Sequence, residues 1–299
     1  MTERWLTIDG YRYACRVHPG PARARPVFFL NGAFQTMDSW GRFVDHYRRS
    51  RTVILCDLPG TGESDELPAA FGLDFFGRAL RLVLESAGVP QTHLFGASYG
   101  APVAYRFAQM YPERVGSMTL AGVARQLPDH VRARTAGTLE IVRTGRLVEF
   151  AREGVDILIG AEAATRVVRS HVVRRVLESA LARLTSRQQR QYIAATTRLL
   201  THAPLDLAAP PSARTLVLTG EHDIYTRPED CREVADALPH ARFVTIPRAG
   251  HLFHLERPDI AIDVFSEFLA DVERPAPAPD AEPSRTGAWP DMVSPSPAT

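Results

Sequence analysis

Gly96-Ala97-Ser98-Tyr99-Gly100 lies between the apolar run Thr92–Phe95 and a helix-like segment from Ala101 to Met110. A strand that turns into a helix within so few residues needs glycines, because they lack a side chain and tolerate a strained backbone. Ser98 in such a turn would project its hydroxyl at the carboxyl edge of a sheet, beside the positive end of the following helix. The stretch predicts a nucleophile elbow, and the alternative is a glycine turn with an incidental serine.

A serine nucleophile requires a base that accepts its proton and an acid that orients the base. Thr215–Thr219 has the composition of a buried strand, and Gly220-Glu221-His222-Asp223 follows at its carboxyl end, where active-site loops of open α/β sheets lie. Asp223 is therefore the predicted acid. Glu221 and His222 are alternatives, and Asp223 could also serve only to stabilise a turn.

The base is predicted after the next strand, Phe243–Ile246. His251 emerges there from a loop that contains Gly250, so no helical direction constrains the histidine ring. His254, three residues further on, is the alternative base. The predicted groups occur in the chain in the order serine, acid, histidine.

The negative oxygen of an acyl-transfer intermediate needs hydrogen-bond donors. The backbone N–H of Tyr99, directly after the serine, is one candidate for this oxyanion hole. The second is predicted in Asn31-Gly32-Ala33-Phe34, which follows another apolar run, and the N–H of Ala33 or Phe34 would donate there. Asn31 and Gly32 are expected to contact the substrate, unless Asn-Gly is an ordinary turn.

The whole chain shows apolar runs that alternate with helical patterns, which predicts an α/β fold with a mostly parallel central sheet and helices on both faces. Asp9-Gly10 predicts a hairpin turn at the edge of this sheet. Strands are expected at residues 27–30, 53–56, 94–95, 118–120, 216–218 and 243–246, and helices at 38–47, 75–86, 101–110, 230–238 and 259–269.

One stretch interrupts the alternation, because residues from about 126 to 204 have helical spacing and contain no convincing strand. We expect this stretch to form a helical cap above the sheet. Residues 1–273 are then one domain. The Pro-, Ala- and Ser-rich residues 274–299 are expected to form a disordered tail, since they cannot bury enough apolar surface to offset their ordering entropy.

Composition narrows the class of protein. The three cysteines show no CxxC spacing, and no signal peptide or membrane span is evident, so we expect reduced thiols and a cytoplasmic location. Neither a nucleic-acid partner nor a cofactor is indicated. No metal is expected, because the histidines and carboxylates lack metal-site spacing. The loop 57–64 lacks the spacing of a dinucleotide-binding loop and is expected to shape the site.

Charge is distributed unevenly. The chain carries a formal net charge of +1, and all 35 of its basic residues are arginine. Between Arg125 and Arg198 there are 14 arginines against 7 acidic residues. This part of the cap could attract an acidic partner, or it could be a solvated helical face.

These motifs together resemble the α/β-hydrolase superfamily over residues from about 10 to 272. The resemblance rests on N-G-A after a strand, D-L-P-G-x-G-x-S, G-x-S-x-G, G-E-H-D and A-G-H-x-x-x-x-E-R-P, and on the order Ser98, Asp223, His251. Residues 30–33, 223–230 and 238–240 further resemble 3-(3-hydroxyalkanoyloxy)alkanoate synthases and related 3-hydroxyacyl-carrier-protein acyltransferases and thioesterases. Those enzymes typically have Ser-Trp-Gly-Gly at the elbow, where this chain has Ser98-Tyr99-Gly100-Ala101.

The resemblance implies a serine hydrolase or acyltransferase that cleaves an ester or thioester through an acyl-enzyme. A 3-hydroxyacyl group on acyl carrier protein or CoA is the narrower expectation, with the acidic carrier protein docking on the arginine-rich cap. A carboxylesterase or lactonase acting on a free small molecule is the main alternative. Carbon–carbon bond hydrolysis and cofactor-free haloperoxidase activity share the scaffold, and a ligand-binding module without catalysis is the alternative from another class.

Overall fold

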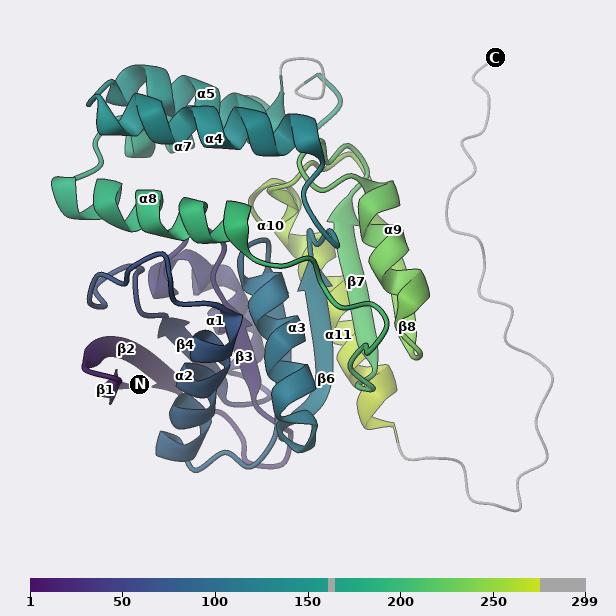
Figure 1. The fold of residues 1–299 in the computed structure, drawn as a ribbon. Helices are drawn as coiled ribbons and strands as arrows, with labels where there is room; N and C mark the ends of the chain where they lie inside the picture. The colour runs from purple at the N-terminus through teal and green to yellow at the C-terminus, as the bar shows by residue number, and fades with distance from the viewer. Residues whose placement is uncertain (161–164, 275–299) are drawn as a thin grey trace, which may run out of the picture.

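The protein, described here by a computed structural model for residues 1–160 and 165–274, is built on an eight-stranded sheet in the order β1-β2-β4-β3-β5-β6-β7-β8 (Figure 1). β2 is antiparallel to both β1 and β4, and the remaining neighbours are parallel. The predicted hairpin at the edge is confirmed, with Asp9 and Gly10 both at positive φ. The predicted mostly parallel α/β fold is confirmed as well.

The elements alternate as the hydrophobic pattern indicates. The strands are β1 (Thr2–Ile8), β2 (Tyr11–His18), β3 (Val27–Leu30), β4 (Val53–Asp57), β5 (Thr92–Ala97), β6 (Val115–Ala121), β7 (Thr215–Gly220) and β8 (Ala241–Ile246). The helices are η1 (Met37–Trp40), α1 (Gly41–Tyr47), α2 (Leu73–Ser86), α3 (Gly100–Met110), η2 (Pro112–Arg114), α4 (Asp129–Arg143), α5 (Leu147–Ile159), α7 (Ser170–Leu181), α8 (Ser186–Thr201), α9 (Pro228–Ala237), α10 (Phe253–Glu256) and α11 (Pro258–Glu273).

Two layers of helices sandwich the sheet. Alternate side chains of the strands pack on one face against α2, α3 and α9, and on the other face against α1 and α11. The central strands are buried on both faces, because parallel strands are covered by their crossover helices. The edge strand β8 pairs only with β7 and is partly exposed, so its residues are less buried than a continuous apolar run predicts.

β5 is longer than its apolar core predicts. It includes His93, a polar residue that is fully buried because Ser117 and Glu273 hydrogen-bond to its two ring nitrogens at 2.7 and 3.0 Å. Burial lowers the pKa of His93 to about 4, so the imidazole is neutral there. An apolar-run criterion misses strand residues of this kind.

The helix predicted over residues 38–47 divides in two. Met37–Trp40 forms a 3₁₀ turn, and the α-helix begins only at Gly41. The turn is held because the Met37 N–H donates to Asp57 Oδ1 at 2.8 Å and the buried Trp40 ring stacks on Phe29. Tertiary contacts therefore override the continuous helical pattern.

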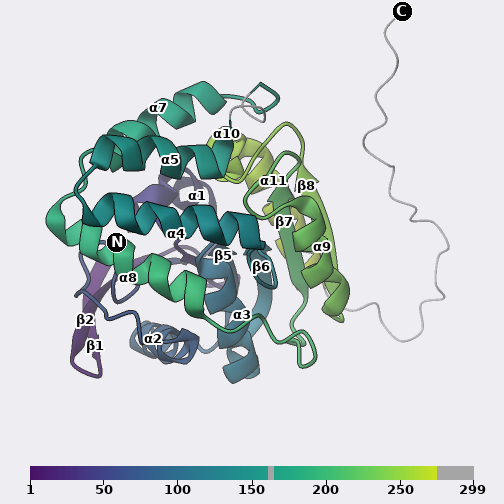
Figure 2. The same ribbon diagram turned by 45° about the horizontal axis from the view of Figure 1, so that its top comes forward.

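Four helices, α4, α5, α7 and α8, form a layer above the carboxyl edge of the sheet (Figure 2). They pack on each other around a small apolar core that includes Phe150 and Val155. In the described residues between β6 and β7 there is no strand. The tail expected from residue 274 lies, apart from Arg274 itself, outside the described residues.

One cap helix, α8, makes hydrogen bonds and an ion pair with the loop that follows β4. Arg187 donates to the carbonyl oxygens of Glu63 and Ser64 at 2.7 and 2.6 Å, and Arg190 pairs with Glu66 at 2.7 Å. Some of the cap arginines therefore hold the cap in place, and they are not all available to a partner.

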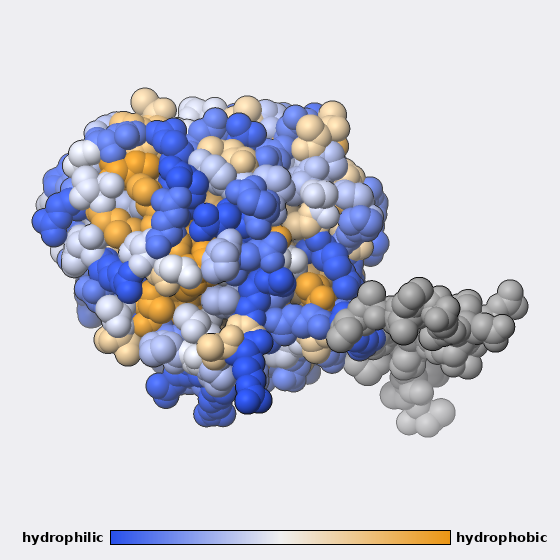
Figure 3. Space-filling model, turned by 90° about the horizontal axis from the view of Figure 1, so that it is seen from below, coloured by the Kyte–Doolittle hydropathy of each residue, from blue (hydrophilic) through white to orange (hydrophobic). Residues whose placement is uncertain are grey.

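The surface away from the cap is seen from below in Figure 3, where hydrophilic side chains separate smaller apolar areas. Across the described part of the chain, none of the helices combines the length and apolarity required to cross a bilayer.

The turn between β5 and α3 is packed without room for a side chain at either glycine. A Cβ on Gly96 would lie 2.5 Å from the Gly100 carbonyl oxygen, and a Cβ on Gly100 would lie 2.6 Å from the carbonyl oxygen of Leu30. Both contacts are with backbone, which cannot rotate away. The two glycines of the elbow are therefore a steric requirement of the fold.

We expect Gly100→Ala to lower the free energy of unfolding by about 2 kcal/mol, because the added methyl group forces β3 and α3 apart. Gly137→Ala is the matched control, since Gly137 lies inside α4 and a Cβ there meets nothing within 4 Å. That change should add about 1 kcal/mol of stability through helix propensity. Urea denaturation checks both values, and equal effects of the two substitutions would contradict this account of the elbow.

Candidate active site

Ser98 lies at the turn between β5 and α3 and faces a cavity under the cap. Its φ angle is +47°, a left-handed conformation that is unusual for a residue other than glycine. Its amide donates to the carbonyl oxygen of Ala121 at 2.7 Å, which ties the turn to the end of the neighbouring strand β6. A strained serine held this firmly presents its hydroxyl in one direction.

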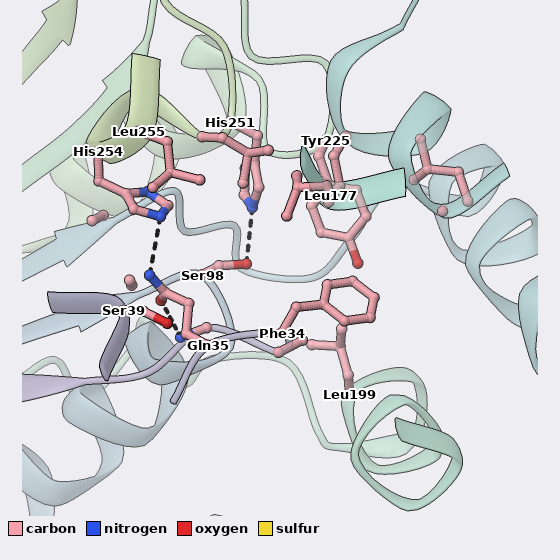
Figure 4. A pocket seen from close by; sticks show the side chains of 18 of the residues that line it. Phe34, Gln35, Ser39, Ser98, Leu177, Leu199, Tyr225, His251, His254 and Leu255 are labelled. Carbon is pink, nitrogen blue, oxygen red and sulfur yellow. Dashed lines mark hydrogen bonds between the residues drawn. The ribbon is translucent and has the colours of Figure 1, made fainter. Parts of the chain in front are cut away.

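The structure brings the three predicted catalytic residues together. His251 Nε2 lies 2.9 Å from Ser98 Oγ (Figure 4), and His251 Nδ1 lies 2.8 Å from Asp223 Oδ2. Because the carboxylate only accepts, Nδ1 carries the hydrogen and donates to Asp223, which leaves the lone pair of Nε2 free to accept from the serine hydroxyl. This is the hydrogen-bond direction that a general base requires.

Asp223 is held by more donors than the histidine alone. Its Oδ1 accepts from the amides of Tyr225 and Thr226 at 2.8 and 2.9 Å, and its Oδ2 accepts from the hydroxyls of Thr219 and Thr226 at 3.0 and 2.9 Å. The carboxylate is buried, and these donors offset the cost of taking its charge out of water. Its orientation toward His251 is therefore fixed.

The alternative acid and base lie elsewhere. Glu221 accepts from the amide of Arg248 at 2.8 Å, and His222 lies within 3.7 Å of Glu221. His254 Nε2 lies 3.0 Å from Gln35 Nε2, so it accepts from this amide group. Hydrogen bonds connect Ser98 to His251 and His251 to Asp223, and none is found between Ser98 or His251 and these three alternative residues among the described contacts.

The predicted oxyanion loop follows β3 and touches the elbow. Gln35 N donates to the Gly32 carbonyl oxygen at 3.1 Å and closes a turn that places Ala33 and Phe34 in the cavity lining. A Cβ on Gly32 would lie 3.6 Å from Cβ of Ser98, so the two segments are in direct contact. Gly32 also lines the cavity.

Asn31 is not placed as predicted. Its side chain is buried away from the cavity lining, where Nδ2 donates to the Cys56 carbonyl oxygen and to Asp57 Oδ1, both at 3.1 Å, and Oδ1 accepts from Trp40 Nε1 at 2.7 Å. With these partners the amide is used within the fold and does not reach substrate. The Asn31 side chain instead connects the end of β3 to β4 and to the 3₁₀ turn η1 through these hydrogen bonds.

Tyr99 offers only its backbone to the site. Its hydroxyl accepts from Arg198 Nη1 at 2.8 Å, and the Arg198 guanidinium also donates to the carbonyl oxygens of Phe71 and Pro68 and stacks over Phe76. The Tyr99 ring therefore points into the join between α8 and the body of the protein. Its amide lies at the N-terminal end of α3, where the helix dipole favours negative charge.

The cavity has a volume of about 220 Å³ and is mostly apolar. Leu177 and Leu199 from the cap and Phe34 from the oxyanion loop enclose it, and the Tyr225 hydroxyl points into it (Figure 4). Among the described residues, no arginine, aspartate or glutamate belongs to its lining. His254 also lines it, and burial together with the neighbouring His251 lowers the pKa of His254 to about 3. The cavity is therefore suited to uncharged groups.

Gln35 and the cap residues of the lining were not predicted from the sequence. Gln35 Oε1 accepts from the Gly32 amide at 2.7 Å while its amide nitrogen donates to His254, so one side chain links the predicted oxyanion loop to α10. In the sequence, only its place in the loop that begins at Asn31 indicated that Gln35 could lie near the site. The described residues contain no cluster of His, Cys, Asp and Glu arranged for a metal ion, and the three cysteines are buried free thiols.

Comparison with known proteins identifies the fold family. A family model described as the alpha/beta hydrolase fold matches residues 25–258. The chain belongs to this family. An alpha/beta hydrolase fold thus accounts for the strand order, the elbow at Ser98 and the cap insertion.

Individual relatives of this alpha/beta hydrolase are distant. A Bacillus subtilis (strain 168) protein, provisionally named 2-succinyl-6-hydroxy-2,4-cyclohexadiene-1-carboxylate synthase, is 26% identical over 279 residues, which cover 88% of this chain and 97% of that protein. A thermophilic esterase from Thermogutta terrifontis, solved with malate bound, has a TM-score of 0.76 at 24% identity and covers 92% of this chain and all of its own. The hydrolase MGS-M2 from a Medee basin deep-sea metagenome has a TM-score of 0.79 at 21% identity, with coverage of 90% and 96%. These two structures share the fold.

Glu256, at the end of α10, is a buried carboxyl beside the site. Its Oε2 accepts from the Gly250 amide at 2.6 Å, and its Oε1 has no hydrogen-bond partner within the described structure. Burial raises the pKa of Glu256 to about 7, opposed by the Gly250 amide and His251 and reinforced by Asp223. Between pH 4.5 and about 7, Glu256 is therefore mostly protonated in the folded protein and mostly ionised in the unfolded chain, where its pKa is 4.5.

We expect the free energy of unfolding to fall as pH rises from about 4.5 to 7, since ionised Glu256 is disfavoured only in the folded state. Glu256→Gln keeps the acceptor for Gly250 and should gain about 3 kcal/mol over the wild type between the ends of this window. Denaturant unfolding at pH 4.5 and 8 measures the difference. Glu233→Gln, at an exposed position on α9, is the control, and parallel pH profiles for all three proteins would contradict the expectation.

Proposed function

We propose that this protein is a serine hydrolase or acyltransferase that cleaves an uncharged ester or thioester through an acyl-enzyme at Ser98. The observation that carries the proposal is the unbroken line of hydrogen bonds from Asp223 through His251 to Ser98, which ends in a mostly apolar cavity. Each group has the partner that its catalytic role requires.

In the first half of the reaction, Ser98 Oγ attacks the carbonyl carbon while its proton passes to His251 Nε2. The carbonyl π electrons move to oxygen, where the amides of Tyr99 and of Ala33 or Phe34 stabilise the negative charge. Asp223 stabilises the imidazolium that forms. The intermediate then collapses, the bond to the alcohol or thiol breaks, and His251 returns its proton to the leaving group.

In the second half, His251 Nε2 takes a proton from water or from a hydroxylated acceptor, whose oxygen attacks the acyl-Ser98 ester. Collapse of this second intermediate returns the proton to Ser98 Oγ and releases an acid or a new ester. The balance between hydrolysis and transfer depends on how well the cap excludes water. Because α4, α5, α7 and α8 cover the cavity, an acceptor that fills it competes with water.

The lining supports an uncharged acyl group. The name of the B. subtilis relative includes a carboxylate, and a buried carboxylate normally requires a cation or several donors. The described lining of this cavity supplies no arginine. An ester or lactone without a second acidic group therefore fits this chain better.

We further propose a carrier-bound 3-hydroxyacyl thioester as the narrower candidate, with acyl carrier protein docking on the cap. Support comes from α7, where the apolar Val172 and Val176 are 41% and 62% exposed. Arg175 on the same helix and Arg183 in the turn after it are exposed, and no described carboxylate pairs with either guanidinium. A basic face with exposed valines complements an acidic carrier protein.

Replacement of the nucleophile tests the proposed chemistry. Ser98→Ala should lower kcat on p-nitrophenyl butyrate by about a thousandfold or more, because no covalent intermediate can form. Intact mass after exposure to a fluorophosphonate should show one adduct on the wild type and none on the variant. Full activity of Ser98→Ala, or a ligand-induced rise in Tm without any turnover, would overturn the proposal, and the second result would favour a binding module.

The docking proposal is tested by charge. The double variant Arg175→Gln, Arg183→Gln should raise KM for a 3-hydroxyacyl carrier protein about tenfold at low salt and weaken the salt dependence. Its kcat/KM for the small N-acetylcysteamine thioester of the same acid should remain at the wild-type value. Arg23→Gln, Arg49→Gln removes the same charge from another face and is the control. Equal KM values for both double variants would exclude docking on α7.

A further inference from the structure

We infer that four hydroxyls in the cavity wall form a subsite for a hydroxyl group on the acyl chain of the substrate, and this inference rests on the proposed function. The hydroxyls belong to Thr135 and Thr138 of α4, Tyr192 of α8 and Tyr225 after β7. We call these four residues the hydroxyl cluster. All four are buried, and all four line the cavity.

The hydroxyl cluster lies beside the reacting groups. The Tyr225 ring packs on the His251 ring with centroids 4.9 Å apart, and the Tyr192 ring stacks on Phe34 of the oxyanion loop at 5.2 Å with an interplanar angle of 12°. In Figure 4 the Tyr225 hydroxyl points into the space between His251 and Phe34. An acyl chain attached to Ser98 therefore passes the cluster near its carbonyl end.

Hydrogen-bond directions within the cluster are determined by one fixed acceptor. Thr138 Oγ1 donates its only hydrogen to the carbonyl oxygen of Thr135 at 2.6 Å. Thr138 must then accept from the Tyr192 hydroxyl, with which it is also hydrogen-bonded. The Tyr192 oxygen is also hydrogen-bonded to the Thr196 side chain, which leaves it one lone pair that can accept from a guest.

The Thr135 hydroxyl is the second group of the cluster that could pair with a guest. Its Oγ1 is buried, and its partner among the described residues is the Tyr225 hydroxyl, in a hydrogen bond of poor geometry. A buried hydroxyl with one poor hydrogen bond is only partly satisfied, so a guest that pairs with it in good geometry is favoured. Burial raises the pKa of Tyr225, which keeps its phenol protonated. Of the Tyr225 and Thr135 hydroxyls, the one that does not donate to the other has a hydrogen for a guest.

A wall with free acceptors and free donors side by side is complementary to a group that both donates and accepts. A hydroxyl satisfies this requirement, whereas an alkyl chain leaves the donors and acceptors unpaired. A carboxylate brings no hydrogen for Tyr192 and finds no cation. The structure therefore favours hydroxyacyl esters or thioesters over their deoxy counterparts.

The test compares matched substrates on the full-length enzyme. N-acetylcysteamine thioesters of hexanoate and of 2-, 3- and 5-hydroxyhexanoate, each as both enantiomers, are assayed by thiol release. At least one hydroxy substrate should exceed hexanoate about tenfold in kcat/KM, the value of one net hydrogen bond. Equal kcat/KM for all substrates would overturn the subsite. Absence of acyl-Ser98 with every substrate would instead contradict the proposed function.

The Thr135→Val variant distinguishes an effect on substrate preference from an effect on protein stability. The change is nearly isosteric, so Tm should be unchanged or higher, while the preference for the hydroxy substrate falls about tenfold. Tyr225→Phe should lower the same preference and serves if Thr135→Val does not fold. Thr197→Val, one residue from the lining residue Thr196 on α8 but outside the lining, should keep the wild-type preference. An unchanged preference in both test variants would overturn the inference.

Discussion

The close approach of β3, β5 and α3 is the constraint on which the rest of the site depends. The carbonyl oxygen of Leu30 occupies the space that a side chain at Gly100 would need, and Gly32 touches Ser98 from the same side. Within this packing Ser98 has a left-handed φ angle of +47°. The same packing also brings the predicted oxyanion loop into contact with Ser98 at the start of α3. The loops after β7 and β8 reach the same place because parallel strands end at one edge of the sheet.

The sequence was sufficient for those parts of the site that depend on local turns and on this common edge. Glycine spacing predicted the elbow, and apolar runs followed by polar loops predicted where Asp223 and His251 emerge. The choice between Asp223 and Glu221 depends on side-chain direction, which periodicity does not contain. Asn31 was misplaced for a related reason. Its partners Trp40, Cys56 and Asp57 lie 9, 25 and 26 residues away, so nothing near Asn31 in the sequence shows that its amide is already satisfied.

In the cap, amino-acid composition alone does not predict which arginines are free to bind a partner. An excess of arginine predicts attraction for anions only where the guanidinium groups are free to pair with them. Arg187, Arg190 and Arg198 instead bind loop residues more than a hundred positions earlier in the chain. The face of α8 toward the cavity carries Tyr192, while the face toward the loop carries these arginines. Both faces of α8 therefore make contacts within the protein. For this reason the apolar periodicity of the sequence could not show which residues of α8 line the cavity.

The absence of charged side chains from the described cavity lining has a consequence for turnover. Hydrolysis of a neutral ester produces an acid that loses its proton at neutral pH, so the guest changes from uncharged to anionic within the cavity. A wall that suits the ester offers the carboxylate few donors and no cation, and the anion is better solvated outside. In the proposed hydrolysis, the lining that favours binding of the neutral ester would bind the anionic product less tightly. Most of the free energy gained by burying the ester would then be lost once the ester bond breaks, and the product would leave without a conformational change dedicated to its release.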